Sequence, residues 1–164
     1  MMKHWKVAVL AVVCLSVVAA FGWKTTFSHC QVPCGIYNDE LRFEMIYNQN
    51  ITTIEKAMKQ IEELSADPGK NANQLARWVV NKEEHAEDIM HMMQQYFLAQ
   101  RIKPAEEGEA YKKYVEQLVL VHKIIVTTMK TKQTTDLENV ETLKDLVDQF
   151  YKSYFGKEHK KHSH

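Results

Sequence analysis

The chain has 164 residues, enough for one domain, and it carries 21 basic and 21 acidic side chains. A formal net charge of zero gives no overall field to attract nucleic acid or an anionic membrane surface, so a nucleic-acid-binding function is disfavoured. Glycine and proline are few, and long stretches rich in Glu, Lys, Gln, Leu, Ile and Met favour helix over sheet, so the composition predicts an all-α protein.

The first 28 residues have the pattern of a signal peptide. A positively charged start precedes an uncharged apolar run over residues 7–20. Small side chains of the kind that a signal peptidase prefers stand before two cleavage points, one after Ala20 and one after Ser28. We therefore expect a leader over residues 1–28 that is removed on export. A membrane-anchored precursor is the alternative, because the apolar run with its flanking aromatic residues reaches about 17 residues, the lower end of the membrane-spanning range.

Residues 29–38 concentrate metal-binding chemistry directly after the leader. Cleavage after Ser28 makes His29 the first residue, and its α-amine and imidazole then lie beside the amide nitrogen of Cys30 and the thiolates of Cys30 and Cys34. Two thiolates, an amine and an amidate can lie in one plane, which suits a square-planar nickel or copper ion better than tetrahedral zinc. The segment therefore predicts a metal-binding hook. A small disulfide loop between the two cysteines is the alternative in an oxidising compartment.

Four amphipathic patterns follow the hook, the first after a helix cap at Asn38. Apolar side chains recur at spacings of three and four residues, which predicts helices. The expected extents are about 39–65, 72–101, Tyr111 to Met129, and Thr135 or Asp136 to Gly156. Helices joined by short connections pack as antiparallel neighbours. We therefore predict an antiparallel four-helix bundle over residues 39–156.

The histidines outside the hook do not have the spacing of a di-iron site in a helical bundle. Such a site needs Glu-x-x-His on two helices and a further Glu on each of the other two. Here Lys82 stands three residues before His85, and Val119 stands three residues before His122. On spacing alone these histidines are interpreted as core or surface residues. The His- and Lys-rich tail, residues 157–164, is interpreted either as a polar extension or as an aid to nickel capture.

The hook has a specific family resemblance. Residues 29–37, His-Cys-Gln-Val-Pro-Cys-Gly-Ile-Tyr, resemble the H-C-x-x-P-C-G-x-Y nickel hook of the nickel-containing superoxide dismutases, and the resemblance extends over the whole mature chain. It implies that nickel is bound by His29, Cys30 and Cys34. It also implies that Tyr37 restricts access to the metal and orders water there.

The same resemblance implies further site residues. Glu44 matches the glutamate that orients the imidazole of the first residue in this family, and residues 82–85 look like the lysine and glutamate run of its second helix. His85 then lies at a position that is arginine in some members, where it would support the site from outside the ligand set. Gln31 departs from the aspartate that is common at its position, and we expect activity to survive this change.

Function, assembly and compartment follow from the resemblance as expectations. The family disproportionates superoxide into oxygen and hydrogen peroxide by cycling nickel between Ni(II) and Ni(III). Its members are made as precursors whose leader a peptidase removes, and they assemble as homohexamers. The type of leader implies export, to a periplasm, to the extracellular space or to a compartment like the thylakoid lumen. Four aromatic residues offer surface for subunit contacts: Tyr47, Trp78, Tyr111 and Tyr151.

Two alternative functions remain open on the sequence. An exported nickel or copper carrier would use the same hook without catalysis. A helical bundle with a disulfide in place of the metal would have no redox activity. Rapid loss of superoxide in the presence of the nickel-loaded protein would separate an enzyme from both.

Overall fold

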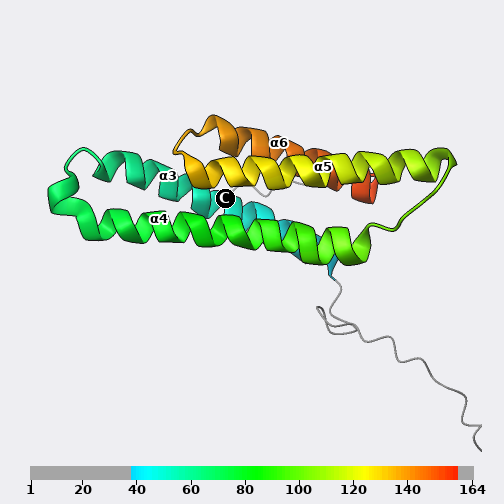
Figure 1. The fold of residues 1–164 in the computed structure, drawn as a ribbon, viewed down its shortest axis with the longest axis horizontal. Helices are drawn as coiled ribbons and strands as arrows, with labels where there is room; N and C mark the ends of the chain where they lie inside the picture. The colour runs from blue at the N-terminus through cyan, green and yellow to red at the C-terminus, as the bar shows by residue number, and fades with distance from the viewer. Residues whose placement is uncertain (1–37, 159–164) are drawn as a thin grey trace, which may run out of the picture. The chain divides into compact units, whose positions relative to one another are not determined.

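The computed structural model describes residues 38–158, and the regular elements in that range are all helices (Figure 1). They form four continuous helices, because two of them pass through a π-helical stretch without a break. The first consists of α2 (Asp39–Glu44), η1 (Met45–Ile51) and α3 (Thr52–Leu64), and the second of α4 (Pro68–His91) and η2 (Met92–Arg101). The third is α5 (Gly108–Gln133) and the fourth is α6 (Glu138–Phe155). The prediction of an all-α protein is confirmed.

Several predictions fall on residues outside this range. The leader, the hook through Tyr37 and residues 159–164 of the tail are not among the described residues. Cleavage, export, the metal ligands and the role of the tail therefore stay predictions. Between residues 38 and 158, no helix combines the length and the apolar character that crossing a bilayer requires.

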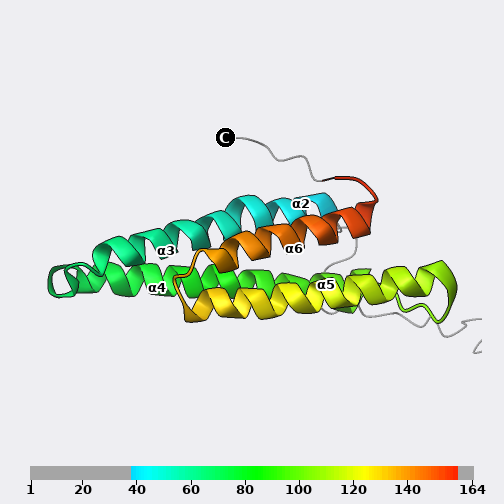
Figure 2. The ribbon, with the colours of Figure 1, turned by 90° about the horizontal axis from the view of Figure 1, so that it is seen from above.

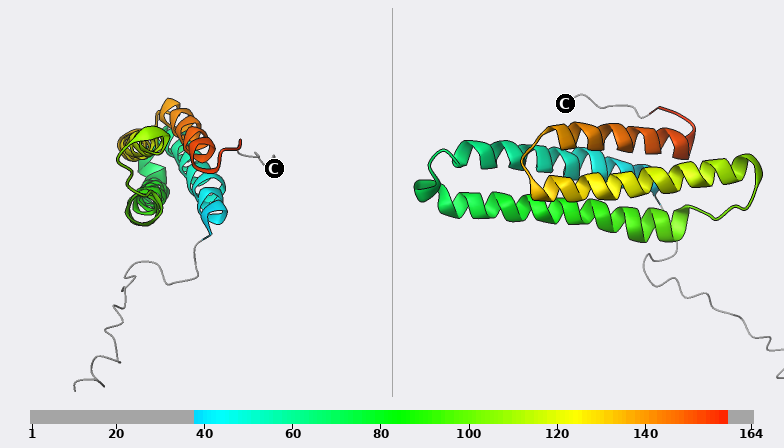
Figure 3. Two further views of the ribbon diagram at one scale, coloured as in Figure 1. Left: turned by 90° about the vertical axis from the view of Figure 1, so that its right-hand side faces the viewer. Right: turned by 45° about the horizontal axis from the view of Figure 1, so that its top comes forward.

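One apolar core joins the four helices, which lie side by side (Figure 2 and Figure 3). Its largest buried side chains include Phe43 of α2, Phe97 of η2 and Phe150 of α6. The ring of Phe43 lies 4.9 Å from that of Phe97 and 5.3 Å from that of Phe150, and the rings of Phe97 and Phe150 are 5.2 Å apart. Tilted rings at such distances attract one another beyond the area they bury. The three rings hold the start of the first helix against the ends of the second and the fourth.

The second helix begins four residues earlier than the sequence predicted. Asp67 is its N-cap, with a carboxylate that accepts a hydrogen bond from the N–H of Lys70 at 3.3 Å, and Pro68 is its first residue. A proline is tolerated in the first turn because its missing N–H has no partner inside the helix there. The Asp-Pro-Gly stretch between the first two predicted helices is therefore the start of the second helix.

A buried lysine accounts for the end of α5, which extends beyond its predicted end to Gln133. Lys82 of α4 is 4% exposed. Its Nζ donates hydrogen bonds to the carbonyl oxygens of Thr131, Lys132 and Thr134 at 2.8, 2.7 and 3.0 Å. The last carbonyl groups of a helix lack partners within the helix and form its negative end, so an ammonium group is favoured there.

The fourth helix ends as predicted, but its N-cap is Leu137 and not Thr135 or Asp136. Asp136 stands just before this cap, and its carboxylate accepts a hydrogen bond from the N–H of Glu138 at 3.0 Å. The hydroxyl of Thr135 instead donates to the carboxylate of Glu62 in α3. At the other end Gly156 has a φ of 71°, a conformation that glycine adopts at little cost and that commonly ends a helix.

Candidate metal centre

The described residues include the two supporting residues that the sequence predicted, while the predicted ligands and Tyr37 lie outside the described range. Glu44 is the last residue of α2, and its side chain is exposed. His85 of α4 is half-buried, and its Nδ1 lies 2.7 Å from the amide oxygen of Asn50 in η1. An amide oxygen only accepts hydrogen bonds, so Nδ1 of His85 is the donor in this contact.

Both helices that contain these residues change to a π-helical stretch nearby. The stretch η1 begins directly after Glu44, and η2 begins seven residues after His85, at Met92. Such stretches are rare and frequently occur at functional sites. A cavity of about 280 Å³ is lined by residues of α2, η1, α4 and η2, among them Arg42, Asn50 and Tyr96. Asn50 therefore links His85 to this cavity.

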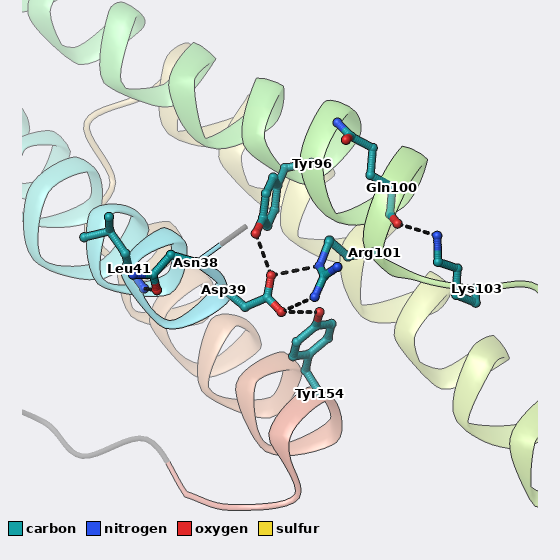
Figure 4. Close-up of polar contacts among 8 residues, drawn as sticks. All are labelled: Asn38, Asp39, Leu41, Tyr96, Gln100, Arg101, Lys103 and Tyr154. Atoms are coloured by element: carbon teal, nitrogen blue, oxygen red, sulfur yellow. Dashed lines mark hydrogen bonds and ion pairs between the residues drawn. The ribbon is translucent and has the colours of Figure 1, made fainter. Parts of the chain in front are cut away.

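A polar cluster lies at Asp39, the residue directly after the predicted hook (Figure 4). Arg101 at the end of η2 binds both carboxylate oxygens, with Nε 2.9 Å from Oδ1 and Nη2 2.6 Å from Oδ2. The hydroxyl of Tyr96 donates to Oδ1 at 2.6 Å, and the hydroxyl of Tyr154 in α6 donates to Oδ2 at 2.9 Å. We call these four residues the Asp39 cluster. It joins the first turn of α2 to the ends of two other helices.

The charge state of the Asp39 cluster is well defined. Burial opposes ionisation of Asp39, but the hydrogen bonds from Arg101, Tyr96 and Tyr154 outweigh it and lower the pKa of Asp39 below its usual value. Burial, and then the hydrogen bond to Asp39, raise the pKa of Tyr96 and of Tyr154 to about 12. The hydrogen bond to Asp39 raises the pKa of Arg101 above its usual value. At neutral pH the cluster is one carboxylate, one guanidinium and two neutral phenols.

The sequence predicts the cap of this helix but not the cluster. Asn38 is the predicted N-cap, and its side chain accepts a hydrogen bond from the N–H of Leu41 at 2.9 Å. The acid at Asp39 looks like an ordinary first-turn residue that complements the helix dipole. Its partners Tyr96, Arg101 and Tyr154 are 57, 62 and 115 residues away along the chain. No spacing rule within one helix pairs residues at such separations.

The hook has the donor types that nickel requires. Between residues 38 and 158, no three His, Cys, Asp or Glu side chains are grouped so that they could hold a metal ion. The predicted ligands are His29, Cys30 and Cys34, which offer an amine, an imidazole, an amide nitrogen and two thiolates. Nitrogen donors with soft thiolates in a planar arrangement fit a square-planar nickel ion.

Comparison with known proteins gives the family. Residues 24–159 match the family described as nickel-containing superoxide dismutase, a span that includes the hook and all four helices. Neither the curated proteins nor the solved structures that were compared include a match. Because the matched span covers most of the chain, the chain belongs to the family of nickel-containing superoxide dismutases, oxidoreductases that act on superoxide with nickel as their cofactor.

Proposed function

We propose that the mature enzyme begins at His29 and that its hook is the nickel site of this superoxide dismutase. In this proposal His29, Cys30 and Cys34 bind the metal, and Tyr37 restricts access to it. The observation that supports it most is the family match from residue 24 to residue 159, which includes the hook and the helices in one continuous span.

The chemistry divides between the cofactor and the chain. Bound nickel supplies the one-electron redox chemistry by which two superoxide anions and two protons become oxygen and hydrogen peroxide. Backbone N–H groups near Cys34 and Gly35 donate hydrogen bonds to the small anion, and Tyr37 orders water at the entrance. Glu44, exposed at the end of α2, accepts a hydrogen bond from the imidazole of His29 and so fixes the orientation of the ring.

The Asp39 cluster gives the hook a fixed point of attachment. Asp39 is two residues beyond Tyr37, and side chains of η2 and α6 bind its carboxylate. A reactive site must be held within roughly 0.5 Å of its productive geometry by groups that are themselves fixed. We assign Asp39 as a positioning residue, which acts on the site through the backbone that leads to Cys34. His85, fixed by Asn50, has a weaker supporting role.

Assembly and processing complete the proposal. The four helices form an antiparallel bundle over residues 39–156, and the protomers assemble as a homohexamer. A peptidase removes residues 1–28 as the chain is exported to a periplasm, to the extracellular space or to a lumen-like compartment. Residues 157–164 remain as a polar tail. Short turns between consecutive helices support the bundle, and the sequence pattern of the leader supports export.

The first residue is the point at which the proposal is easiest to test. A chain that keeps Ser28 has an amide in place of the α-amine of His29. We expect the chain starting at His29 to dismutate superoxide at least about a hundredfold faster than the chain starting at Ser28, because the latter lacks a ligand and displaces the imidazole. Both proteins are loaded with nickel in reducing buffer, and superoxide decay is followed by pulse radiolysis.

Two further measurements make the comparison decisive. Circular dichroism of the two apo proteins should agree, because the helices draw their stability from their own apolar faces. The electron paramagnetic resonance spectrum of the nickel-loaded proteins should differ. Equal activity and equal spectra would refute the role of the α-amine. Nickel binding by the His29 form without dismutation would identify a carrier instead of an enzyme.

A further inference from the structure

The helix α5 has a second apolar face, directed away from the core. Five of its large apolar side chains are 37 to 46% exposed: Tyr111, Val115, Val119, Val126 and Met129. They are half of the ten exposed large apolar residues among residues 38–158. Exposed apolar side chains scattered singly are ordinary, whereas a contiguous group of them marks an interaction site.

These five residues share one side of the helix, which we call the outer face of α5. At 3.6 residues per turn they fall within about 80° of one another around the helix axis. The exposed His122 falls in the same sector. The buried Leu120, Ile124 and Thr128 are centred on the opposite side. Figure 2 shows α5 along one side of the described helices, consistent with one face in the core and one face outside.

The outer face adds to what the sequence predicted. The apolar pattern from Tyr111 to Met129 predicted one helix, and periodicity alone does not show that this helix has two apolar sides. It also expected Tyr151 to offer aromatic surface for subunit contacts, but that side chain is 8% exposed and belongs to the core. Tyr111 is the residue of that aromatic set that lies on the outer face of α5.

Two pairs of opposite charges along one edge of the outer face are placed symmetrically about its middle. Glu116 precedes and Lys123 follows the point between residues 119 and 120 by equal numbers of residues. Glu109 and Lys130 are placed around the same point, further out, and Glu109 also pairs with Lys112 on its own helix. When the helix is turned end for end about that point, each acid takes the place of a base.

We propose that the outer face of α5 is a contact between two copies of this chain, with their α5 helices antiparallel across a two-fold axis near residues 119 and 120. A two-fold contact requires a surface that is complementary to itself. Here the apolar centre meets the same apolar centre, and Glu116 of each copy meets Lys123 of the other. A hexamer with dihedral symmetry contains such two-fold contacts. The inference rests on the proposed self-association and is independent of the nickel chemistry.

Charge reversal tests this arrangement directly. Glu116→Lys and Lys123→Glu each create two like-charge contacts across the axis, so each should raise the dissociation constant of the contact by about tenfold or more. The double variant restores opposite charges and should return the constant to within about threefold of the wild type. Glu116 and Lys123 are two helical turns apart, roughly 10 Å, so they cannot pair within one chain.

The experiment uses the apo protein starting at His29, in reducing buffer, and sedimentation velocity over a range of concentrations. Val119→Asp, at the centre of the face, should give the largest loss of association. Lys70→Glu, an exposed charge reversal on α4, is the matched control and should leave the constant unchanged. Circular dichroism checks that every variant is folded.

Each other result overturns the inference in a distinguishable way. A double variant as weak as the single variants would mean that Glu116 and Lys123 do not face each other across copies. Assembly that none of the variants alters would assign self-association to a different face. A wild-type protein that stays monomeric would refute the contact and the proposed hexamer together, while the dismutase activity of the nickel-loaded protein is measured separately.

Discussion

Two charged side chains, Asp39 and Lys82, tie together helices that are far apart in the sequence, and they are bound in opposite ways. Asp39 accepts hydrogen bonds from side chains only, those of Tyr96, Arg101 and Tyr154 among the described residues. Lys82 donates to three backbone carbonyl oxygens at the end of α5. The contacts of Asp39 therefore depend on which side chains surround it, whereas the contacts of Lys82 depend only on the backbone at the end of a helix.

The difference separates support of the fold from support of the site. Every helix ends in carbonyl groups without partners, so the contribution of Lys82 is to complete α5 and the turn after it. Asp39, in the first turn after the hook, is bound instead by three particular side chains from two other helices. We therefore expect substitution of Lys82 to affect stability and substitution of Asp39 to affect activity.

The largest expected effect is on stability, from Lys82→Met. The change removes three hydrogen bonds of a charged group and leaves buried carbonyl oxygens unsatisfied, while part of the cost of burying the charge is recovered. The free energy of unfolding should fall by about 2 to 4 kcal/mol. Urea denaturation of the apo protein measures it. Dismutation per folded, nickel-loaded protomer should stay at the wild-type value.

Lys144→Met is the matched control for Lys82. Lys144 is 25% exposed at its side chain and forms ion pairs with Glu55 and Glu141. These pairs keep contact with solvent, so each contributes about 1 kcal/mol or less. A loss for Lys144→Met equal to that for Lys82→Met would show that burial and carbonyl capping do not distinguish the two lysines.

The second effect is on activity, from Asp39→Asn. The amide keeps the size of the side chain but removes the charge that binds both Nε and Nη2 of Arg101. Because a small displacement of a reactive site is costly, dismutation should fall by about tenfold. The electron paramagnetic resonance lines of the nickel-loaded protein should broaden, since the hook would sample more geometries. Asp39→Glu, which keeps the charge, should recover part of the activity.

Glu55→Gln is the control that separates positioning from general stability. Glu55 of α3 is a partly buried carboxylate bound by Lys59 and Lys144, and their hydrogen bonds lower its pKa. Glu55→Gln should lower the free energy of unfolding about as much as Asp39→Asn does. The electron paramagnetic resonance spectrum of the nickel-loaded variant should stay as in the wild type. If Asp39→Asn behaved in the same way, Asp39 would have a structural role only.

The contrast also explains what the sequence could predict. The four helices follow from spacings within each helix, and the hook follows from nine consecutive residues, so both kinds of information are local. The contact between Asp39 and Arg101 joins residues that are 62 positions apart, and no local sequence pattern near either residue predicts it. The outer face of α5 repeats apolar residues at spacings of three, four and seven residues, as a core face does, so the sequence alone does not show that this face is exposed.

The smallest expected effect is on the pH dependence of stability, and it has two branches. The pKa of Asp39 is lowered in the folded protein, so the unfolded chain takes up its proton first as the pH falls. The contribution of this carboxylate is complete above its ordinary pKa of about 4 and is lost as the pH falls through the folded value. The pKa values of Tyr96 and Tyr154 are raised to about 12, so their contribution is complete below about pH 10 and is lost toward pH 12.

Titration of the phenols isolates the alkaline branch from every other group in the protein. Absorbance at 295 nm follows tyrosine ionisation directly, and in the folded apo protein two tyrosines should ionise at about pH 12. Burial and the carboxylate of Asp39 both raise these pKa values. Asp39→Asn should therefore shift the two transitions toward pH 10, but burial should still keep them above the ordinary pKa of tyrosine. Lys82→Met should leave them in place as long as the protein is folded, because Lys82 has no contact with either phenol among its hydrogen bonds. If all tyrosines of the folded wild type ionised together near pH 10, the Asp39 cluster would not exist in solution, and the attachment of the hook would need another explanation.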